Sequence, residues 1–123
     1  MRFQGKIIRG HGIGRQLSFP TLNFEIPDNF VTEYGVYAAR ISWDLKTFSA
    51  ILFFGRRETF DGEKSLEVHI LDEEISEAPQ SAEVEIFEKI RDVRKFTSEE
   101  ELKKQIVKDC ATTRRILKLG LKI

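Results

Sequence analysis

The chain of 123 residues is 41% hydrophobic and 33% charged, which is typical of a soluble globular protein and excludes a disordered one. Its 20 basic and 20 acidic residues cancel, so no net positive field attracts nucleic acid or an anionic membrane. No apolar segment has membrane-spanning length, and the start lacks the apolar core of a signal peptide. We therefore expect a single domain over residues 1–123, without a nucleic-acid or membrane partner.

The first predicted strand, KIIRG at residues 6–10, runs into a glycine-rich stretch, GHGIGRQLSFPTLNF, at residues 10–24. Two familiar phosphate-binding loops do not fit this stretch. A Rossmann loop must open a helix, whereas Pro20 follows here with no helical pattern before it. A Walker loop needs lysine and a hydroxyl after its last glycine, whereas Arg15 follows Gly14. Taken alone, the glycines favour an ordinary turn between strands.

The residues that follow the glycines favour a metal site. Thr21 and Asn23 project to the same side of an extended segment, because side chains alternate along a strand. Pro20 restricts the backbone before them. A hydroxyl and an amide oxygen side by side suit a hard cation such as magnesium, which needs few protein ligands when substrate phosphates supply charge.

Four further strands are predicted at residues 35–43, 47–55, 65–71 and 82–90, all rich in β-branched and aromatic residues or alternating in polarity. Asp44, Leu45 and Lys46 form a short connection between the first two. In the third, Leu66, Val68 and Ile70 share one face, and Glu67 and His69 share the other. In the fourth, we expect Val84, Ile86 and Ile90 to share one face.

One helix is predicted after these strands. Ser98 and Glu101 have the spacing of a capping box, and acidic residues fill the first turn. An apolar stripe that can pack on a sheet recurs at Leu102, Ile106, Cys110, Thr113 and Leu117. Cys110, the only cysteine, is expected to be a small buried residue, and its lack of a disulfide partner favours a reducing cytoplasm. Strands followed by one helix predict an all-β closed antiparallel barrel with a helix packed outside.

Five segments, in order along the chain, resemble the riboflavin kinase family. The glycine-rich stretch with FPTLN is similar to the family's Gly-Phe-Pro-Thr-Ala-Asn loop, and GVYAARI to its Gly-Val-Tyr strand. FFGRRETF is similar to its Gly-x-x-Pro-Thr-Phe segment, and LEVHIL to the strand that carries its catalytic glutamate. The last segment, from residue 89 into the helix, resembles the family's Arg-x-x-x-Lys-Phe motif and closing helix.

The resemblance implies a six-stranded antiparallel Greek-key barrel with a C-terminal helix, and transfer of the ATP γ-phosphate to riboflavin, giving FMN. It makes Glu67 the catalytic base and places the Mg²⁺ that accompanies ATP on Thr21 and Asn23. The implied nucleotide-binding residues are Gly10, Gly12, Gly14, Arg15, Phe19, Pro20, Thr21 and Asn23. Arg91, with Lys95 and Phe96, corresponds to a mobile loop that closes over flavin and nucleotide.

Each of these residues also has a plainer interpretation. Most strand carboxylates are simply solvated, so Glu67 alone would carry no function. Arg91 lies in a run of charged residues that is equally compatible with an exposed face. His69 shares a face with Glu67 and is expected to be a structural histidine. The departures from the family pattern are Ser18, Leu22, Glu58 and the absence of a Leu-Tyr-Gly turn after residue 71.

Three functions compete. The preferred one is a cytoplasmic, monomeric riboflavin kinase that stops at FMN, because the chain has no room for the adenylyltransferase domain to which bacterial relatives are fused. The alternative is a catalytically weak flavin- or nucleotide-binding barrel of the same family with a regulatory role, which the departures motivate. An oligonucleotide-binding barrel is disfavoured, because no basic stripe is present.

Overall fold

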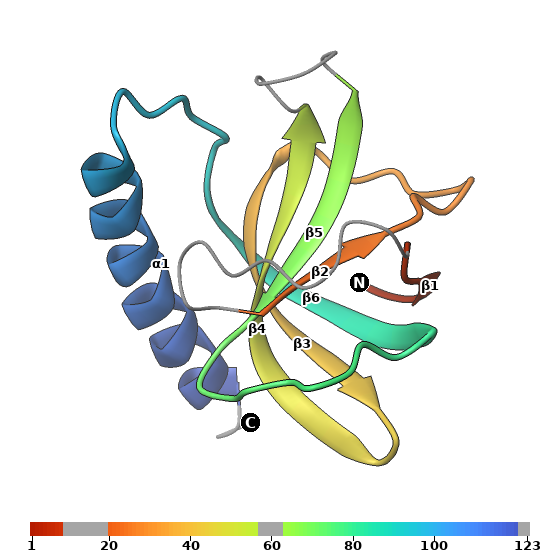
Figure 1. The fold of residues 1–123 in the computed structure, drawn as a ribbon. Coiled ribbons are helices and arrows are strands. Elements are labelled where there is room, and N and C mark those ends of the chain that lie inside the picture. Colours follow the sequence, from red (N-terminus) through yellow and green to blue (C-terminus); the bar gives the residue numbers. More distant parts are fainter. Residues whose placement is uncertain (9–19, 57–62, 121–123) are drawn as a thin grey trace.

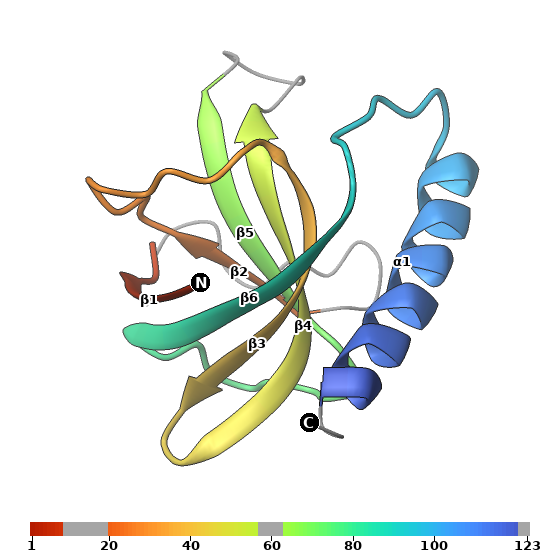
Figure 2. The same ribbon diagram turned by 180° about the vertical axis from the view of Figure 1, so that it is seen from behind.

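The computed structural model describes residues 1–8, 20–56 and 63–120 (Figure 1). These residues form six strands and one helix: β1 (Arg2–Lys6), β2 (Thr21–Phe24), β3 (Gly35–Trp43), β4 (Lys46–Arg56), β5 (Lys64–Ile70), β6 (Ser81–Arg91) and α1 (Glu99–Gly120). The strands make one antiparallel sheet in the order β1-β6-β3-β4-β5-β2. The sheet is curled into a half-barrel, and α1 lies on its outer side (Figures 1 and 2).

The β3–β4 hairpin confirms the short connection predicted after residues 35–43, except that Lys46 belongs to β4. Its connection consists of Asp44 and Leu45, which have positive φ angles of 48° and 64°. Two positive φ angles in a two-residue loop are typical of the turns whose twist matches that of antiparallel strands. The hairpin is the longest pairing of the sheet, running from Gly35 opposite Phe54 to Trp43 opposite Lys46.

The main hydrophobic core fills the concave side of the sheet. The predicted alternation in β5 is confirmed, since Leu66, Val68 and Ile70 are almost fully buried while Glu67 and His69 face the other way. The other buried residues of this core are Leu22, Phe24, Tyr37, Ala39, Ile41, Ala50, Leu52, Phe54, Ala82, Val84 and Ile86. Alternate residues of each strand therefore remain available for the outer face.

A second, smaller core lies between the outer face and α1. It consists of Val36, Ile51, Leu71 and Cys110, with Ile106 packed against it. The predicted stripe of α1 is confirmed, because its last three members, from Cys110 to Leu117, are at most 4% exposed. The start of α1 is capped as predicted at Ser98, whose Oγ accepts a hydrogen bond from the Glu101 amide. The Glu101 carboxylate reaches back to Thr97 instead of Ser98.

One prediction about β6 is wrong. Val84 and Ile86 pack in the main core, but Ile90 packs in the second core on the opposite face. The pairing of β6 with β3 shifts register twice between these residues, leaving Phe87 and Ile90 as extra residues. Such bulges reverse the side-chain alternation locally and bend the strand. The bend carries the end of β6 toward α1.

The two edge strands approach each other at one end of the sheet. Among the described residues they share an isolated bridge between Ile7 and Phe24, not a full ladder. The Ile8 amide donates to the Asn23 carbonyl at 2.8 Å, and the Glu25 amide donates to the Lys6 carbonyl at 2.9 Å. The structure therefore confirms six antiparallel strands with one C-terminal helix, and it shows a curled half-barrel where a closed barrel was predicted.

Candidate functional site

The pairing of β2 with β5 brings three predicted site residues together. Thr21 lies opposite His69, and Asn23 lies opposite Glu67. Because the intervening residue Leu22 is buried in the main core, the other four side chains share the outer face of the sheet. A carboxylate, a hydroxyl, an amide and an imidazole thus form one cluster, which we call the β2–β5 cluster.

Two hydrogen bonds hold side chains of this cluster in place. Thr21 Oγ1 lies 2.9 Å from His69 Nδ1. The Ser65 hydroxyl donates to Glu67 Oε2 at 2.6 Å. Ser65 is buried and lies two residues before Glu67 on the same strand face. The Ser65 hydroxyl therefore fixes the orientation of the Glu67 carboxylate.

His69 is half-buried on the outer face of β5, the face on which α1 packs. Burial lowers its pKa, while the nearby carboxylates of Glu67 and Asp109 oppose this change. The net shift is downward, so the imidazole is neutral at pH 7 and has one nitrogen that can accept a hydrogen bond. His69 was expected to be a structural histidine, and in the structure its hydrogen-bond partner is the Thr21 hydroxyl.

Arg91, at the end of β6, is paired with a residue of α1 that the sequence analysis missed. Its Nε donates to both carboxylate oxygens of Asp109 at 3.0 Å, and its Nη2 lies 2.9 Å from Oδ2. Asp109 is 4% exposed and also accepts a hydrogen bond from Gln105. An aspartate three residues after Ile106 and four before Thr113 falls within the buried stripe of α1, which is the signal that could have identified it.

The other two predicted lid residues lie between β6 and α1. Phe96 is half-buried, and the guanidinium groups of Arg91 and Arg94 lie over its ring at 5.6 Å and 4.7 Å. Lys95 is exposed. The structure therefore brings Arg91 and Phe96 together at the end of β6.

Arg91 and Glu67 lie in the same row across the outer face of the sheet. The register connects Arg91 to Val36, Val36 to Phe53, Phe53 to Glu67, and Glu67 to Asn23. At about 4.8 Å between strands, three strand spacings separate Arg91 from Glu67 by about 14 Å measured along the curved sheet. Between them lie Val36, which is buried in the second core, and Phe53, which packs against that core.

The remaining predicted nucleotide-binding residues fall mostly outside the described part of the chain. These are Gly10, Gly12, Gly14, Arg15 and Phe19, together with the departures at Ser18 and Glu58. Pro20 is described, and its carbonyl accepts a hydrogen bond from the Ile70 amide at 2.9 Å. The departure at Leu22 has a structural explanation, since its side chain fills the main core and points away from the oxygens of Thr21 and Asn23.

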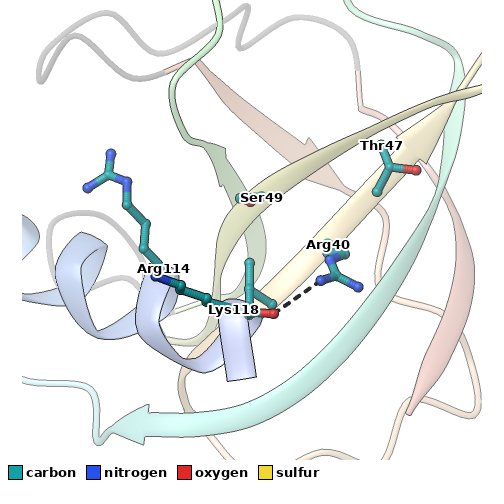
Figure 3. A pocket seen from close by; sticks show the side chains of 6 residues that line it. Arg40, Thr47, Ser49, Arg114 and Lys118 are labelled. Carbon is teal, nitrogen blue, oxygen red and sulfur yellow. Dashed lines mark hydrogen bonds between the residues drawn. The ribbon is translucent and has the colours of Figure 1, made fainter. Parts of the chain in front are cut away.

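A pocket of about 410 Å³ lies elsewhere, between β3, β4 and the last turns of α1 (Figure 3). It is lined by Arg40, Thr47, Ser49, Arg114, Leu117 and Lys118, none of which was predicted as a site residue. Arg40 Nη2 donates to the Leu117 carbonyl at 3.3 Å, and Arg114 is paired with Asp72. Figure 3 shows the guanidinium groups of Arg40 and Arg114 pointing in different directions, so they do not converge on one ligand.

Within residues 1–8, 20–56 and 63–120, no group of three or more histidine, cysteine, aspartate or glutamate side chains could hold a metal ion. In the same part of the chain, no helix is long and apolar enough to cross a membrane.

The chain matches the family model of riboflavin kinase, called Flavokinase, over residues 1–117. The bifunctional riboflavin kinase/FMN adenylyltransferase of Haemophilus influenzae is 37% identical over 117 residues, which are 92% of this chain and 37% of that protein. The corresponding protein of Buchnera aphidicola from Acyrthosiphon pisum is 36% identical over 85% of this chain and 35% of its own length. This chain thus spans little more than a third of these curated relatives.

Two solved structures share the fold of this chain. A Streptococcus pneumoniae crystal structure, described as a macrolide-efflux protein, has a TM-score of 0.78 and 30% identity, covering 92% of this chain and 38% of that one. Riboflavin kinase from Trypanosoma brucei has a TM-score of 0.61 at 21% identity, covering 95% of this chain and 79% of that one, and shares the fold. With nearly its whole length matched by the family model, this chain belongs to the riboflavin kinase family.

Proposed function

We propose that this chain is a riboflavin kinase, which transfers the γ-phosphate of ATP to the 5′-hydroxyl of riboflavin and releases FMN and ADP. The observation that carries the proposal is the β2–β5 cluster, in which Glu67 lies beside Asn23 and on the same face as Thr21. A carboxylate next to two neutral oxygens is what a phosphoryl transfer to an alcohol needs, namely a proton acceptor and a place for a phosphate-bound cation.

Glu67 acts as the general base. The ribityl hydroxyl oxygen forms a bond to the γ-phosphorus, the bond from that phosphorus to the ADP oxygen breaks, and the hydroxyl proton passes to the Glu67 carboxylate. Ser65 donates to one carboxylate oxygen, Oε2, and so orients the carboxylate. Most of the rate enhancement comes from alignment of the alcohol with the phosphate, to which a fixed carboxylate contributes.

Thr21 Oγ1 and Asn23 Oδ1 hold the magnesium ion of MgATP. Both side chains lie on the outer face of β2, and neither carries charge, which fits an ion that arrives with the nucleotide and keeps most of its waters. When bound there, magnesium neutralises the charge that develops on the phosphate oxygens. The glycine-rich stretch, with Gly10, Gly12, Gly14, Arg15 and Phe19, completes the nucleotide site in this proposal.

The flavin lies beside the second core, with its ring toward Arg91. It does not rest on Val36, which is 3% exposed and buried in the core beneath α1. In this proposal Arg91, Lys95 and Phe96 form the closing segment at one end of the ring. The ribityl chain then points toward Glu67.

The same proposal covers closure of the barrel, the domain organisation, the oligomeric state and the location of the protein. The bridge and hydrogen bonds between the ends of β1 and β2 support closure of the half-barrel into a Greek-key barrel. We further propose that residues 1–123 act as a single, monomeric domain in the cytoplasm. A catalytically weak regulatory barrel is the alternative that the experiment below would reveal.

The proposal is tested by incubating the protein with riboflavin, magnesium and ATP, CTP or GTP in turn, and separating the flavins by chromatography. We expect FMN with at least one nucleotide and none when magnesium is replaced by EDTA. Tight binding of riboflavin or nucleotide without FMN formation would instead establish the regulatory alternative. Loss of FMN formation in the Glu67→Gln variant shows that the activity belongs to this chain.

A further inference from the structure

We propose that Val93 sets the rate at which riboflavin and FMN enter and leave, by holding the segment between β6 and α1 against the outer face of β4. Residues 92–97, which we call the strap, are the part of the proposed closing segment that moves. The inference rests on the proposed function, because it takes the flavin to lie between Arg91 and Glu67. It goes further by assigning control of flavin exchange to one apolar side chain.

Both ends of the strap are fixed. Arg91, just before it, donates to the buried carboxylate of Asp109 on α1. At the other end, the Thr97 hydroxyl donates to the Glu101 carboxylate, and the hydroxyl of Ser98 caps the helix. Motion of the strap is therefore confined to the residues between these two points, and the strap lifts from the sheet without releasing either end.

Two polar contacts of the strap with its surroundings are exposed. Asp92 pairs with Lys89, and the Asp92 side chain is 86% exposed. Arg94 Nη1 donates to Gln105 Oε1 at 3.4 Å, which is long for a hydrogen bond, and Arg94 is exposed. Exposed contacts of this kind contribute little, because water competes for both partners. They therefore do little to hold the strap down.

Val93 supplies an apolar contact between the strap and β4. It is half-buried, and it lies over Gly55 beside the ring of Phe53. A Cβ added at Gly55 would lie 3.0 Å from Val93 Cγ2 and 3.2 Å from Phe53 Cζ, so the valine occupies the space that the missing side chain leaves. Phe96, the other half-buried apolar residue of the strap, packs against arginine side chains instead. Burial of Val93 on the sheet thus favours the seated strap.

The position of Val93 places the strap across the way to Glu67. In Figure 1 the strap runs on the side of the sheet that faces α1. Phe53, beside which Val93 lies, pairs with Glu67 on the neighbouring strand β5. The strap therefore starts at Arg91 and reaches the strand next to that of Glu67. A flavin with its ring toward Arg91 and its ribityl chain toward Glu67 lies under the strap, and it enters or leaves when Val93 moves off β4.

A contact that holds the strap equally with and without flavin has a distinctive effect on binding kinetics. Weakening the contact raises the population of the lifted strap by the same factor in both states. The association and dissociation rate constants of the flavin then rise together, and Kd stays the same. A side chain that instead contacts the flavin changes mainly the dissociation rate constant, and Kd with it.

Flavin exchange is measured by stopped-flow fluorescence with riboflavin as the probe, in the presence of MgADP so that no phosphoryl transfer occurs. Val93→Ala removes two methyl groups from the contact with β4. Val31→Ala is the matched control, because it makes the same change at a residue that is 90% exposed. For Val93→Ala we expect both rate constants to rise about threefold to fivefold, which corresponds to the loss of two partly buried methyl groups. Kd is expected to stay within about twofold.

The other outcomes are distinct from this one. An increase in the dissociation rate constant alone, with weaker binding, would make Val93 a flavin contact and overturn the inference. Rate constants no different from those of Val31→Ala would show that Val93 does not control exchange. If riboflavin did not bind to the unmodified chain, the proposed function itself would be wrong, and the inference that rests on it would be wrong too.

Gly55→Ala tests the same contact from the side of the sheet. The added methyl group displaces Val93, because Phe53 is packed against the second core and yields less readily than the strap. We expect both rate constants to rise, as in Val93→Ala. In the Val93→Ala background the change at Gly55 is expected to add little, because the methyl group that it displaces is gone. An equal effect in both backgrounds would mean that Gly55→Ala acts through Phe53, and would contradict the role of Val93.

Discussion

Glu67 illustrates how little a single residue reveals before its neighbours are known. In the sequence it is one of many strand carboxylates, and alternation with Leu66 and Val68 predicts only that it faces away from the core. The structure adds Asn23 on the neighbouring strand and the hydroxyl of Ser65 at 2.6 Å. Pairing of β2 with β5 joins segments more than forty residues apart, which no local pattern could predict.

The first residue-scale prediction concerns Glu67→Gln. The substitution keeps the shape and the hydrogen bond from Ser65 but removes the proton acceptor. We expect kcat to fall by about a hundredfold to ten-thousandfold, the range of general-base catalysis, with little change in the affinity for either substrate. Steady-state kinetics and calorimetry measure the two effects separately. Normal turnover in this variant would remove Glu67 from the mechanism.

The second residue-scale prediction concerns Thr21→Val and Asn23→Leu. Each removes one oxygen from the outer face of β2 while preserving volume, and the buried neighbour Leu22 is untouched. We expect the affinity for MgADP to fall at least about tenfold, which is typical when a group that supports a metal site is lost. The affinity for riboflavin is expected to change little. Thr21→Ser is the control, since it keeps the hydroxyl. Parallel losses for both ligands would indicate a folding defect.

At the scale of elements, β6 and α1 together determine where Arg91 lies. The bulges at Phe87 and Ile90 turn the end of β6 toward the helix, and Asp109 receives the Arg91 guanidinium there. Regular alternation predicted the face of Val84 and Ile86 correctly but failed at Ile90. A bulge leaves no clear mark in the sequence, since it depends on how the partner strand is paired.

The element-scale prediction is that Arg91→Ala destabilises the fold. The Arg91 side chain is 20% exposed and that of Asp109 is 5% exposed, so removing the arginine leaves a buried carboxylate unpaired. Breaking a buried pair costs about 3–5 kcal/mol, and thermal or urea unfolding measures it. Arg94→Ala is the matched control, because Arg94 also stacks on Phe96 but is exposed.

A second variant tests the cause of this loss. In the Arg91→Ala, Asp109→Asn double variant the carboxylate charge is gone while the amide can still bond Gln105, so part of the lost stability should return. A loss that is the same in single and double variants would contradict the ion-pair explanation.

The lid role of Arg91 is tested by a separate measurement. Hydrogen exchange across residues 88–97 is measured with and without both ligands, and increased protection on binding is expected.

At the scale of the whole molecule, local patterns predicted the elements better than their assembly. The strand at residues 35–43 and the cap at Ser98 follow from composition, alternation and spacing, and the structure confirms them. Strand order, by contrast, depends on long-range pairing, as in β1 beside β6 and β2 beside β5. Asp109 was missed for the same reason, because its importance depends on Arg91, which lies on another element.

The closing of the sheet is a property of the whole molecule, and Gly5 offers a way to test it. A Cβ added at Gly5 would lie 2.6 Å from Cδ2 of Phe24, a fully buried ring that packs edge-on against Phe3. Phe24 cannot move away easily, because it forms the bridge with Ile7. Gly5→Ala therefore forces β1 away from β2, at a cost of about 1–3 kcal/mol for overpacking.

Besides lowering the stability of the whole fold, Gly5→Ala is expected to change hydrogen exchange at the junction of β1 and β2. The amides of Ile8 and Glu25 donate across the junction of β1 and β2, so both should be protected from hydrogen exchange in the unmodified chain. Gly5→Ala should accelerate their exchange more than that of Ile41, which lies in the centre of the sheet. Gln4→Ala is the control, since Gln4 is exposed on the same strand. If the Ile8 and Glu25 amides exchange in the unmodified chain as fast as in an unfolded one, the two edges do not join in solution and the molecule is an open half-barrel.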